Sequence, residues 1–299
     1  MWRQEIIDTK RGPFEVFTKG AGEPLCITHL YSEFNELGYY FAEPFTTNFK
    51  VYLVNLKEAG ASCQAQTDDE LSMLESCKDL EAIREALEIE QWGFAGHSTG
   101  GMLALVYSVY FNTSLTKVMI GGSTASKHYM NHQESMYCRE SPLNKRIKEI
   151  MAILGSPQSA RSLRVKVNRE WTEMSLYRPE NFDRYFSKLS SGKVVPKRLD
   201  YYSYQELPNY DIRELLPEAS VPAFVYCGRH DAQCPLPFSE EITSLLPYSR
   251  LYIFEESNHM PYLEEQEKFE AMVIAFSLLR KRGVSIAEQN NDEKKSAEQ

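Results

Sequence analysis

The 299-residue chain is long enough to form one large α/β domain with an inserted segment and to bury a substantial core. Apolar residues make up 42% of the chain and charged residues 25%, which is ordinary for a soluble globular protein. The net charge of −9 argues against general nucleic-acid binding, because neutralising phosphate groups requires a basic surface.

The N-terminal residues predict an antiparallel hairpin at the edge of a β-sheet. Residues 5–8 and 14–17 alternate in the manner of paired strands, and Arg11-Gly12-Pro13 supplies the turn between them. Short apolar runs at residues 24–28 and 51–55 then predict strands that are covered on both faces.

Helices separate the strands in the predicted order. Residues 38–44 predict a first short helix, and residues 68–87 carry apolar side chains at a helical spacing. A further strand is predicted at residues 117–122. Strands that alternate with helices in this way predict a mostly parallel sheet with right-handed crossovers.

A candidate nucleophile lies in the run Gly96-His97-Ser98-Thr99-Gly100. Apolar residues precede this run and helix-forming residues follow it, which is the strand–turn–helix context of a nucleophile elbow. The helix N-terminus behind the Ser98 hydroxyl is suited to stabilising an oxyanion. An ordinary turn serine is the alternative, and the His97 side chain is expected to point away from the hydroxyl.

Residues 123–205 break the alternation and predict an inserted helical lid. The segment is rich in methionine and aromatic residues, which are expected to pack the lid helices and to enclose a largely apolar pocket. The run Tyr201-Tyr202-Ser203-Tyr204 is a candidate for the pocket wall. His128 and His132 are spaced for one face of a helix, but no third ligand has suitable spacing, so no metal is expected.

Two later strands end beside residues that could activate a serine. The apolar run at 223–228 leads into Arg229-His230-Asp231, and the strand at 250–254 is followed by a loop that contains His259. Asp231 is the candidate acid and His259 the candidate base. The structural alternatives are a turn or cap role for Asp231 and a helix cap at His259. His230 is interpreted as a loop residue beside the acid.

The chain resembles the α/β-hydrolase superfamily over nearly its whole length. Ser98, Asp231 and His259 follow one another in the order typical of that fold. Similar proteins carry a G-x-x-D element and an H-x-P-x-x-E element, which correspond here to residues 228–231 and 259–264. Among them, the chain looks most like lid-bearing proline iminopeptidases and related esterases. The resemblance implies a mostly parallel central sheet flanked by helices, with an inserted helical lid.

The loop after the third strand, which in similar proteins completes the oxyanion hole and is called the oxyanion loop here, departs from the family pattern. Similar proteins usually have His-Gly after the third strand, whereas this chain has His29-Leu30-Tyr31 and lacks the glycine-rich run of prolyl peptidases. The backbone N–H of Thr99 is expected to combine with that of Leu30 or Tyr31, and Tyr31 is favoured. His29 is interpreted as a residue that positions this loop.

The predicted organisation is a core domain of residues 1–122 and 206–285, a lid of residues 123–205, and a disordered tail of residues 286–299. The first residues lack the apolar core of a signal peptide, and no run is long enough to span a membrane. The six cysteines include no C-x-x-C pair, so we expect reduced thiols in a cytoplasmic protein that is a monomer or homodimer.

These features predict a serine hydrolase that needs no cofactor and cleaves a small or medium, partly apolar ester or amide through an acyl-enzyme. A serine nucleophile argues against dehalogenase or epoxide hydrolase chemistry, for which similar folds use aspartate. The alternatives are a proline iminopeptidase, a C–C bond hydrolase and a non-catalytic small-ligand receptor. A peptidase would need an anionic lid group for the substrate ammonium, and the candidates are Glu134, Glu140, Glu170, Glu173 and Glu206.

Overall fold

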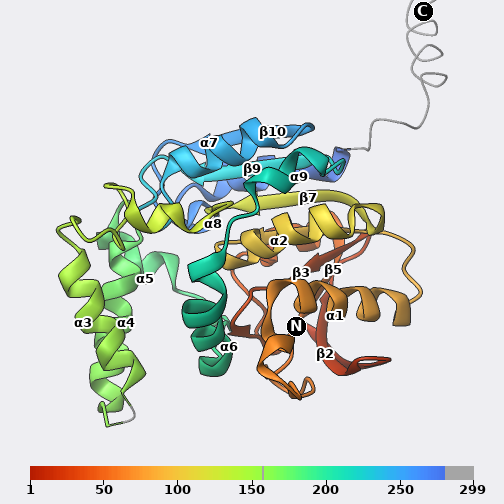
Figure 1. Cartoon of the computed structure of the whole chain (residues 1–299), viewed down its shortest axis with the longest axis horizontal. Helices are drawn as coiled ribbons and strands as arrows, with labels where there is room; N and C mark the ends of the chain where they lie inside the picture. Colours follow the sequence, from red (N-terminus) through yellow and green to blue (C-terminus); the bar gives the residue numbers. More distant parts are fainter. Residues whose placement is uncertain (157, 280–299) are drawn as a thin grey trace, which may run out of the picture.

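A twisted β-sheet crosses the molecule in the computed structural model, which describes residues 1–156 and 158–279 (Figure 1). Its eight strands within the described residues lie in the order β1-β2-β5-β3-β6-β7-β9-β10. Their bounds are β1 Arg3–Thr9, β2 Gly12–Lys19, β5 Phe49–Val54, β3 Glu23–Ile27, β6 Trp92–His97, β7 Leu115–Gly121, β9 Ala223–Gly228 and β10 Ser249–Phe254.

The pairing directions agree with the predicted arrangement. β1 and β2 form an antiparallel hairpin at one edge, and β2 also pairs antiparallel with β5. All other neighbouring pairs in this sheet are parallel. The predictions of an edge hairpin and a mostly parallel sheet are therefore confirmed.

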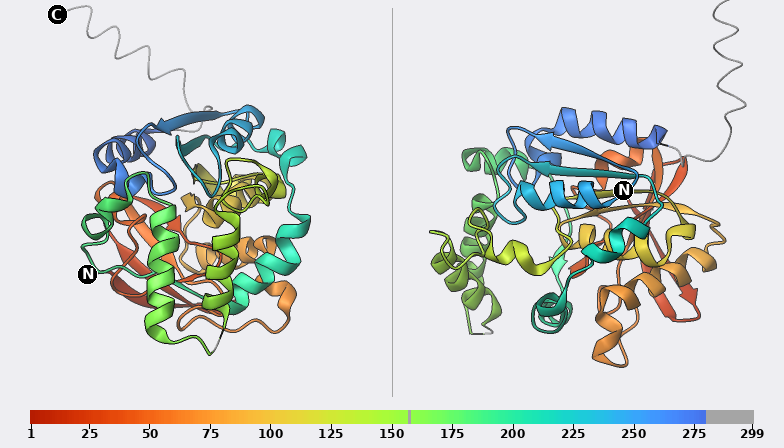
Figure 2. Two further views of the ribbon diagram at one scale, coloured as in Figure 1. Left: turned by 90° about the vertical axis from the view of Figure 1, so that its left-hand side faces the viewer. Right: turned by 45° about the horizontal axis from the view of Figure 1, so that its top comes forward.

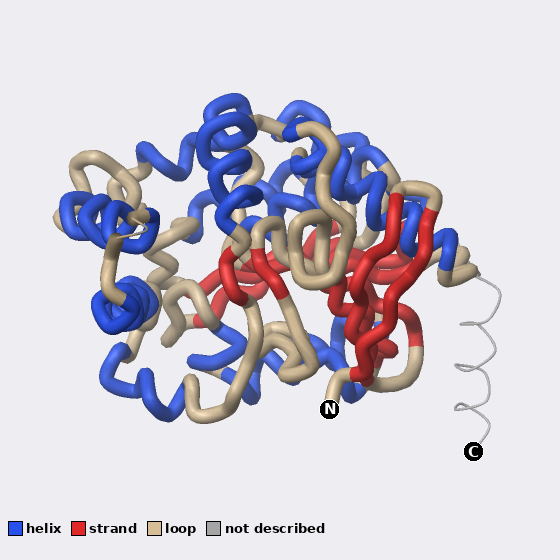
Figure 3. Tube along the Cα trace, turned by 90° about the horizontal axis from the view of Figure 1, so that it is seen from below, coloured by secondary structure: helices blue, strands red, loops and turns tan. Residues whose placement is uncertain are grey.

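Helices cover both faces of the sheet, as seen from below in Figure 3. α1 (Met73–Ala86), α2 (Thr99–Tyr110) and α7 (Leu236–Leu245) pack on one face, whereas α9 (Gln266–Leu278) and the 3₁₀ helix η1 (Glu43–Thr47) pack on the other. Side chains alternate between the faces along each strand, so that Phe94 joins the first core cluster and Ala95 the second. Burial on both faces explains why the strands are near-continuous apolar runs.

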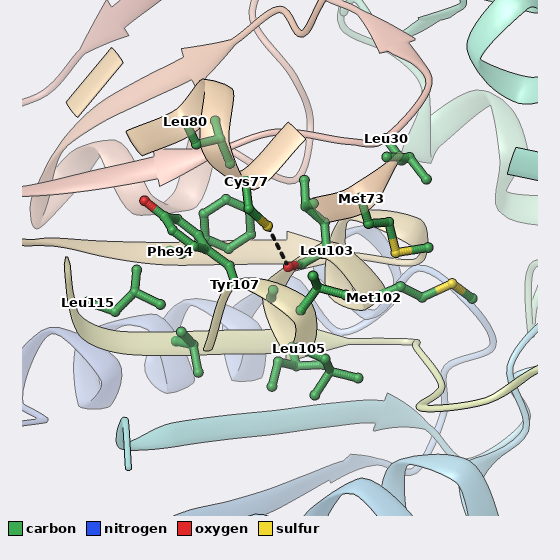
Figure 4. Close-up of a cluster of buried hydrophobic side chains, with 14 of the residues drawn as sticks. Leu30, Met73, Cys77, Leu80, Phe94, Met102, Leu103, Leu105, Tyr107 and Leu115 are labelled. Carbon is green, nitrogen blue, oxygen red and sulfur yellow. Dashed lines mark hydrogen bonds between the residues drawn. The ribbon is translucent and has the colours of Figure 1, made fainter. Parts of the chain in front are cut away.

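Several polar atoms in the core beneath α1 and α2 are hydrogen-bonded, and the dashed line in Figure 4 marks one such bond, from Cys77 Sγ to the Leu103 carbonyl. Trp92 Nε1 donates to the Tyr107 hydroxyl at 2.9 Å, and that hydroxyl donates to Glu81 Oε1 at 2.5 Å. A polar group in an apolar interior is costly unless it is hydrogen-bonded. This network lets two large aromatic side chains fill the core beside the helix that follows Ser98.

The lid helices project from one side of the sheet (Figure 1). They are α3 (Asn144–Gly155), α4 (Arg161–Met174), α5 (Phe182–Tyr185) and α6 (Pro196–Tyr201). α3 and α4 lie side by side as a hairpin (Figure 2). The chain returns from the lid through β8 (Lys193–Val194), which pairs antiparallel with β4 (Ser32–Glu33) next to β3. This small ribbon joins the end of the lid to the core.

Two helix boundaries differ from the sequence prediction. The short helix expected at 38–44 is wrong, since 3₁₀ geometry begins only at Glu43 and runs to Thr47. Pro44 is the reason, because proline fits the first turn of a helix rather than its end. The helix expected at 68–87 is divided at Ser72, whose side chain accepts a hydrogen bond from Glu75 N at 3.3 Å and caps α1.

The predicted tail, residues 286–299, and the last part of the predicted core lie outside the described residues. Within the described part of the chain, no helix combines the length and the apolar content that crossing a bilayer requires. The six cysteines are free thiols, and five of them are buried.

Candidate active site

Ser98 occupies a strained turn between β6 and α2. Its backbone has φ 57° and ψ −123°, a conformation that few residues other than glycine adopt. Gly96 makes the turn possible, since a Cβ there would lie 1.9 Å from the Gly100 carbonyl oxygen. The local sequence therefore holds the Ser98 side chain at the N-terminus of α2, as expected for a nucleophile elbow.

Asp231 and His259 form a buried pair at the carboxyl ends of β9 and β10. Each residue is only 3% exposed, and His259 Nδ1 donates to Asp231 Oδ2 over 2.8 Å. Asp231 Oδ1 accepts from the backbone N–H groups of Gln233 at 2.9 Å and Cys234 at 2.8 Å. These donors hold the carboxylate in one orientation, so that Oδ2 faces the imidazole.

The loop that carries His259 is tied to both the acid loop and the lid. Asn258 Oδ1 accepts from Ala232 N at 2.8 Å, next to the acid. The His259 backbone N–H donates to the Ser175 carbonyl at 3.1 Å, just beyond the end of α4. His259 is thus positioned by its own backbone N–H and by the side chain of the preceding residue, Asn258.

The end of β7 packs against the Ser98 elbow and the Asp231–His259 pair. Gly122 has φ +48°, and a Cβ there would lie 3.1 Å from Asp231 Oδ2 and 3.2 Å from His259 Cε1. The Ser98 backbone N–H donates to the neighbouring Gly121 carbonyl at 2.8 Å. Ser98, Asp231 and His259 are therefore gathered around the ends of adjacent parallel strands, where ligands bind in open α/β sheets.

The predicted oxyanion loop lies against the elbow. His29 is buried, and its ring bridges Thr99 Oγ1 at 3.1 Å and Ser32 Oγ at 2.9 Å. Burial lowers the pKa of His29 to about 3, so the ring is neutral at physiological pH. The Tyr31 N–H donates to His29 Nδ1 at 3.5 Å, and Thr99 begins α2, where a helix offers its N–H no internal acceptor. His29 thus contacts both the backbone of the loop at Tyr31 and the elbow residue Thr99.

Tyrosines and a methionine form an aromatic wall beside this loop. The Tyr202 hydroxyl contacts Met102 Sδ at 3.4 Å and the Tyr129 hydroxyl at 3.4 Å, and its ring packs 5.8 Å from that of Tyr31. Tyr204, which the sequence placed in the same wall, is instead 74% exposed. The run that contains them is wound partly as a π-helix, Tyr202–Glu206, which turns successive side chains in different directions.

A model of the alpha/beta hydrolase fold matches residues 20–266, which include Ser98, Asp231 and His259. The chain belongs to the α/β-hydrolase fold family. The predicted resemblance and fold class are confirmed.

Relatives of this α/β-hydrolase include enzymes of different specificity. The chain is 27% identical to a proline iminopeptidase of Heyndrickxia coagulans over 66% of this chain and 70% of the relative. It is 24% identical to a pimeloyl-(acyl-carrier protein) methyl ester esterase of Vibrio atlanticus over 86% of this chain and 95% of the relative. A solved α/β-fold hydrolase from Bacillus anthracis strain Sterne is 50% identical, with a TM-score of 0.91, over 92% of this chain and 99% of that structure.

Most of the acidic lid residues considered for ammonium binding already have partners in this α/β-hydrolase. Glu170 receives two hydrogen bonds from Arg146, at 2.6 and 2.7 Å, and Glu173 pairs with Arg169 at 2.8 Å. Glu206 Oε1 accepts from the Met73 N–H at the start of α1 at 2.7 Å. The remaining two candidates, Glu134 and Glu140, are exposed.

Glu206 lies at a cavity whose lining includes neither Asp231 nor His259. It lines this cavity of about 350 Å³ between α1, α2 and the segment that follows the lid, together with Tyr201. Burial raises the pKa of Glu206 to about 7. Its carboxylate therefore belongs to the junction of lid and core.

The predicted histidine pair does not share a helical face. His128 lies in the five-residue 3₁₀ helix Lys127–Asn131, and His132 follows in extended conformation, with its ring packed on Phe238. Across residues 1–156 and 158–279, the acidic, histidine and cysteine side chains form no group of three arranged to hold a metal ion. His230 stacks on Tyr177 of the lid, with ring centres 4.5 Å apart.

The sequence analysis did not foresee the contacts that three residues make at the site. The His97 ring packs against His259 in a tilted arrangement, with ring centres 4.6 Å apart, while its Nδ1 lies 2.9 Å from the Tyr226 hydroxyl. A Cβ at Gly122 would lie within 3.2 Å of both members of the buried pair, and Arg198 reaches the oxyanion loop from α6. A Gly-Gly pair at the end of a predicted parallel strand is the one local signal that pointed to Gly122.

Gly122→Ala is expected to lower kcat by about 10- to 100-fold, because the new methyl group would displace the buried pair. The strained φ adds a stability loss of about 1–2 kcal/mol. Gly155→Ala is the matched control, since a Cβ there meets no atom within 4 Å. Steady-state kinetics and thermal unfolding measure both effects, and unchanged kcat in the Gly122 variant would contradict the close contact.

Proposed function

We propose that this α/β-hydrolase is a serine hydrolase that cleaves a small or medium, partly apolar carboxylic ester through an acyl-enzyme. The carrying observation is the 2.8 Å hydrogen bond between buried Asp231 and His259, beside the strained elbow of Ser98. An acid, a base and a serine at a helix N-terminus form the constellation that acyl transfer requires. Fluorophosphonate labelling of Ser98 tests this proposal.

In the proposed mechanism, Ser98 attacks the substrate carbonyl while His259 Nε2 accepts its proton. Asp231 holds the ring through Nδ1–H and stabilises the imidazolium that forms. The oxyanion is bound by the N–H groups of Thr99 and Tyr31, aided by the dipole of α2. His259 then protonates the leaving alcohol, and water releases the acid by the reverse sequence.

The surroundings of Ser98 favour an apolar acyl group. Tyr202 contacts Tyr31, Tyr129 and Met102, and Met102 lies on α2, the helix that follows Ser98. Burial raises the pKa of Tyr31 to about 12, so this wall is uncharged at physiological pH. Aromatic and methionine side chains bind apolar groups and exclude water, which strengthens the electrostatic interactions in the site.

A prolyl aminopeptidase is the second candidate, favoured by the similarity to proline iminopeptidases. Its substrate carries an ammonium that needs an available carboxylate. Glu170 and Glu173 are neutralised by arginines, and Glu206 faces another cavity. These contacts favour a carboxylic ester over a prolyl amide as the substrate. A C–C bond hydrolase would share the triad, and a receptor that only binds ligands would not turn over any substrate.

The ester is therefore expected to be the better substrate. kcat/KM for p-nitrophenyl butyrate should exceed that for proline p-nitroanilide by at least about 100-fold, because the phenolate leaves readily and no ammonium site has to be filled. Steady-state kinetics with both substrates on the same enzyme preparation measure this ratio. A preference for the prolyl amide that disappears in Glu134→Gln or Glu140→Gln would establish the peptidase instead.

A further inference from the structure

Arg198 is a buried cation at the junction of lid and core. It lies on α6, and only 1% of its surface is exposed. Among the described residues, its guanidinium forms no ion pair with a carboxylate. Its hydrogen bonds run to the carbonyl oxygens of Leu30, Lys57 (3.2 Å) and Leu71 (3.2 Å) and to Ser76 Oγ (2.7 Å).

Such a group is unusual, because burying a charge is costly unless its donors are satisfied. Burial lowers the pKa of Arg198 to about 10, so the side chain still carries its charge at neutral pH. The planar guanidinium presents several donors in a fixed geometry, which suits binding several carbonyls at once. The arrangement therefore fixes these carbonyls relative to α6.

The bond to Leu30 acts on the oxyanion loop. Leu30 and Tyr31 share one peptide group, and in a planar trans peptide the C=O and the N–H point in opposite directions. By holding the Leu30 carbonyl, Nε of Arg198 also sets the direction of the Tyr31 N–H. The next carbonyl is held by the same segment, since Val195 N donates to Tyr31 O at 2.8 Å.

The pairing of β4 with β8 continues this contact through Ser32 and Glu33. The end of the lid therefore binds four consecutive residues of the loop. The Leu30 side chain anchors the loop from the other direction, because it is buried in the core cluster beneath α1 and α2 (Figure 4).

We infer that Arg198 is a positioning residue for the oxyanion hole, holding the Leu30–Tyr31 peptide so that the Tyr31 N–H stays on the side of the loop that faces the His29 ring and the elbow. This N–H donates only a long, 3.5 Å hydrogen bond, to His29 Nδ1, and the oxyanion formed by the attack of Ser98 is the stronger acceptor. The inference rests on the proposed serine hydrolase function. It gives a physical reason why leucine is accepted where similar proteins have glycine: the loop is held by a buried side chain and by a buried cation. It also couples the seating of the lid to the formation of the oxyanion hole.

Arg198→Met removes the donors and keeps an apolar side chain in their place. Losing one oxyanion donor costs about 10²–10³ in kcat, and misplacing one should cost less. We expect kcat for p-nitrophenyl butyrate to fall about 10- to 100-fold while KM changes by less than about threefold. Arg198→Lys keeps the charge but cannot reach all the acceptors, so its kcat should lie between those of wild type and Arg198→Met.

Lys117→Met is the matched control, since Lys117 is a buried cation toward the amino end of β7, bonded to Glu23 at 2.9 Å. It should lose stability and keep the wild-type kcat. If kcat of folded Arg198→Met stays within about threefold of wild type, or if only KM changes, Arg198 has no positioning role. Should Arg198→Met fail to fold, the same criterion applies to Arg198→Lys: its kcat must fall while its KM stays nearly unchanged.

Amide hydrogen exchange separates failure of this inference from failure of the proposed function. Absence of both ester hydrolysis and fluorophosphonate labelling in the wild type would reject the function alone. The amides of residues 30–34 should still exchange at least about tenfold faster in the Arg198 variant than in Lys117→Met, because the loop has lost its anchor. Equal exchange rates would overturn the role of Arg198 whatever the activity.

Discussion

Ser98→Ala is expected to lower kcat by about 10⁴- to 10⁶-fold and to leave the fold intact. The change removes one hydroxyl, and alanine meets the same backbone strain at φ 57° as serine. The hydrogen bonds that shape the elbow use the Ser98 main chain, which donates to Gly121 O at 2.8 Å and accepts from Gly101 N at 2.9 Å. Ester kinetics and thermal unfolding of the purified variant measure the two effects.

Ser108→Ala is the matched control for this prediction. Ser108 lies on the same helix and is buried, and its hydroxyl donates to the Leu105 carbonyl at 2.8 Å. Removing it should cost about 1 kcal/mol of stability and no activity. Near-wild-type turnover by Ser98→Ala would refute the nucleophile, as would a fluorophosphonate label found on any other residue.

Asp231→Asn is expected to lower kcat by up to about 10⁴-fold with little change in structure. Asp231 Oδ1 accepts from two backbone N–H groups, so the carboxamide oxygen must occupy that position and the amide NH₂ must face His259. His259 Nδ1 then has to accept a hydrogen bond. The ring proton is forced onto Nε2, which can no longer take the proton of Ser98.

Kinetics and an NMR assignment of the His259 tautomer test this prediction together. Asp211→Asn is a suitable control, since Asp211 is an exposed carboxylate paired with Arg213. It should keep the wild-type kcat. If Asp231→Asn remains nearly fully active with Nε2 unprotonated, a different carboxylate must orient the base.

Local signals in the sequence were sufficient for most of the fold. The glycine pattern around Ser98, the apolar strands and the helical spacing each depend on residues close together in the chain, so single segments carry them. The parallel order followed from the alternation of strands and helices. The expected helix at 38–44 was wrong because the position of Pro44 within a helix outweighed the apolar run before it.

Such local signals could not predict the contacts between segments that are distant in the sequence. The sequence offered five glutamates as ammonium ligands, and only packing showed that Arg146 and Arg169 bind two of them while Glu206 faces another cavity. The prediction that His128 and His132 share one helical face was likewise wrong, because the chain there forms only a five-residue 3₁₀ helix.

By itself, the sequence determined the fold class and the order of the candidate triad, because strand, turn and helix preferences are set by neighbouring residues. Only the tertiary structure decided how the site is supported. Gly122 is needed because three strand ends converge beside it. Arg198 reaches the carbonyl of Leu30 from 168 residues away, a contact that exists only once the lid has packed on the core. Burial and the meeting of distant segments are products of packing, and no local pattern in the chain encodes them.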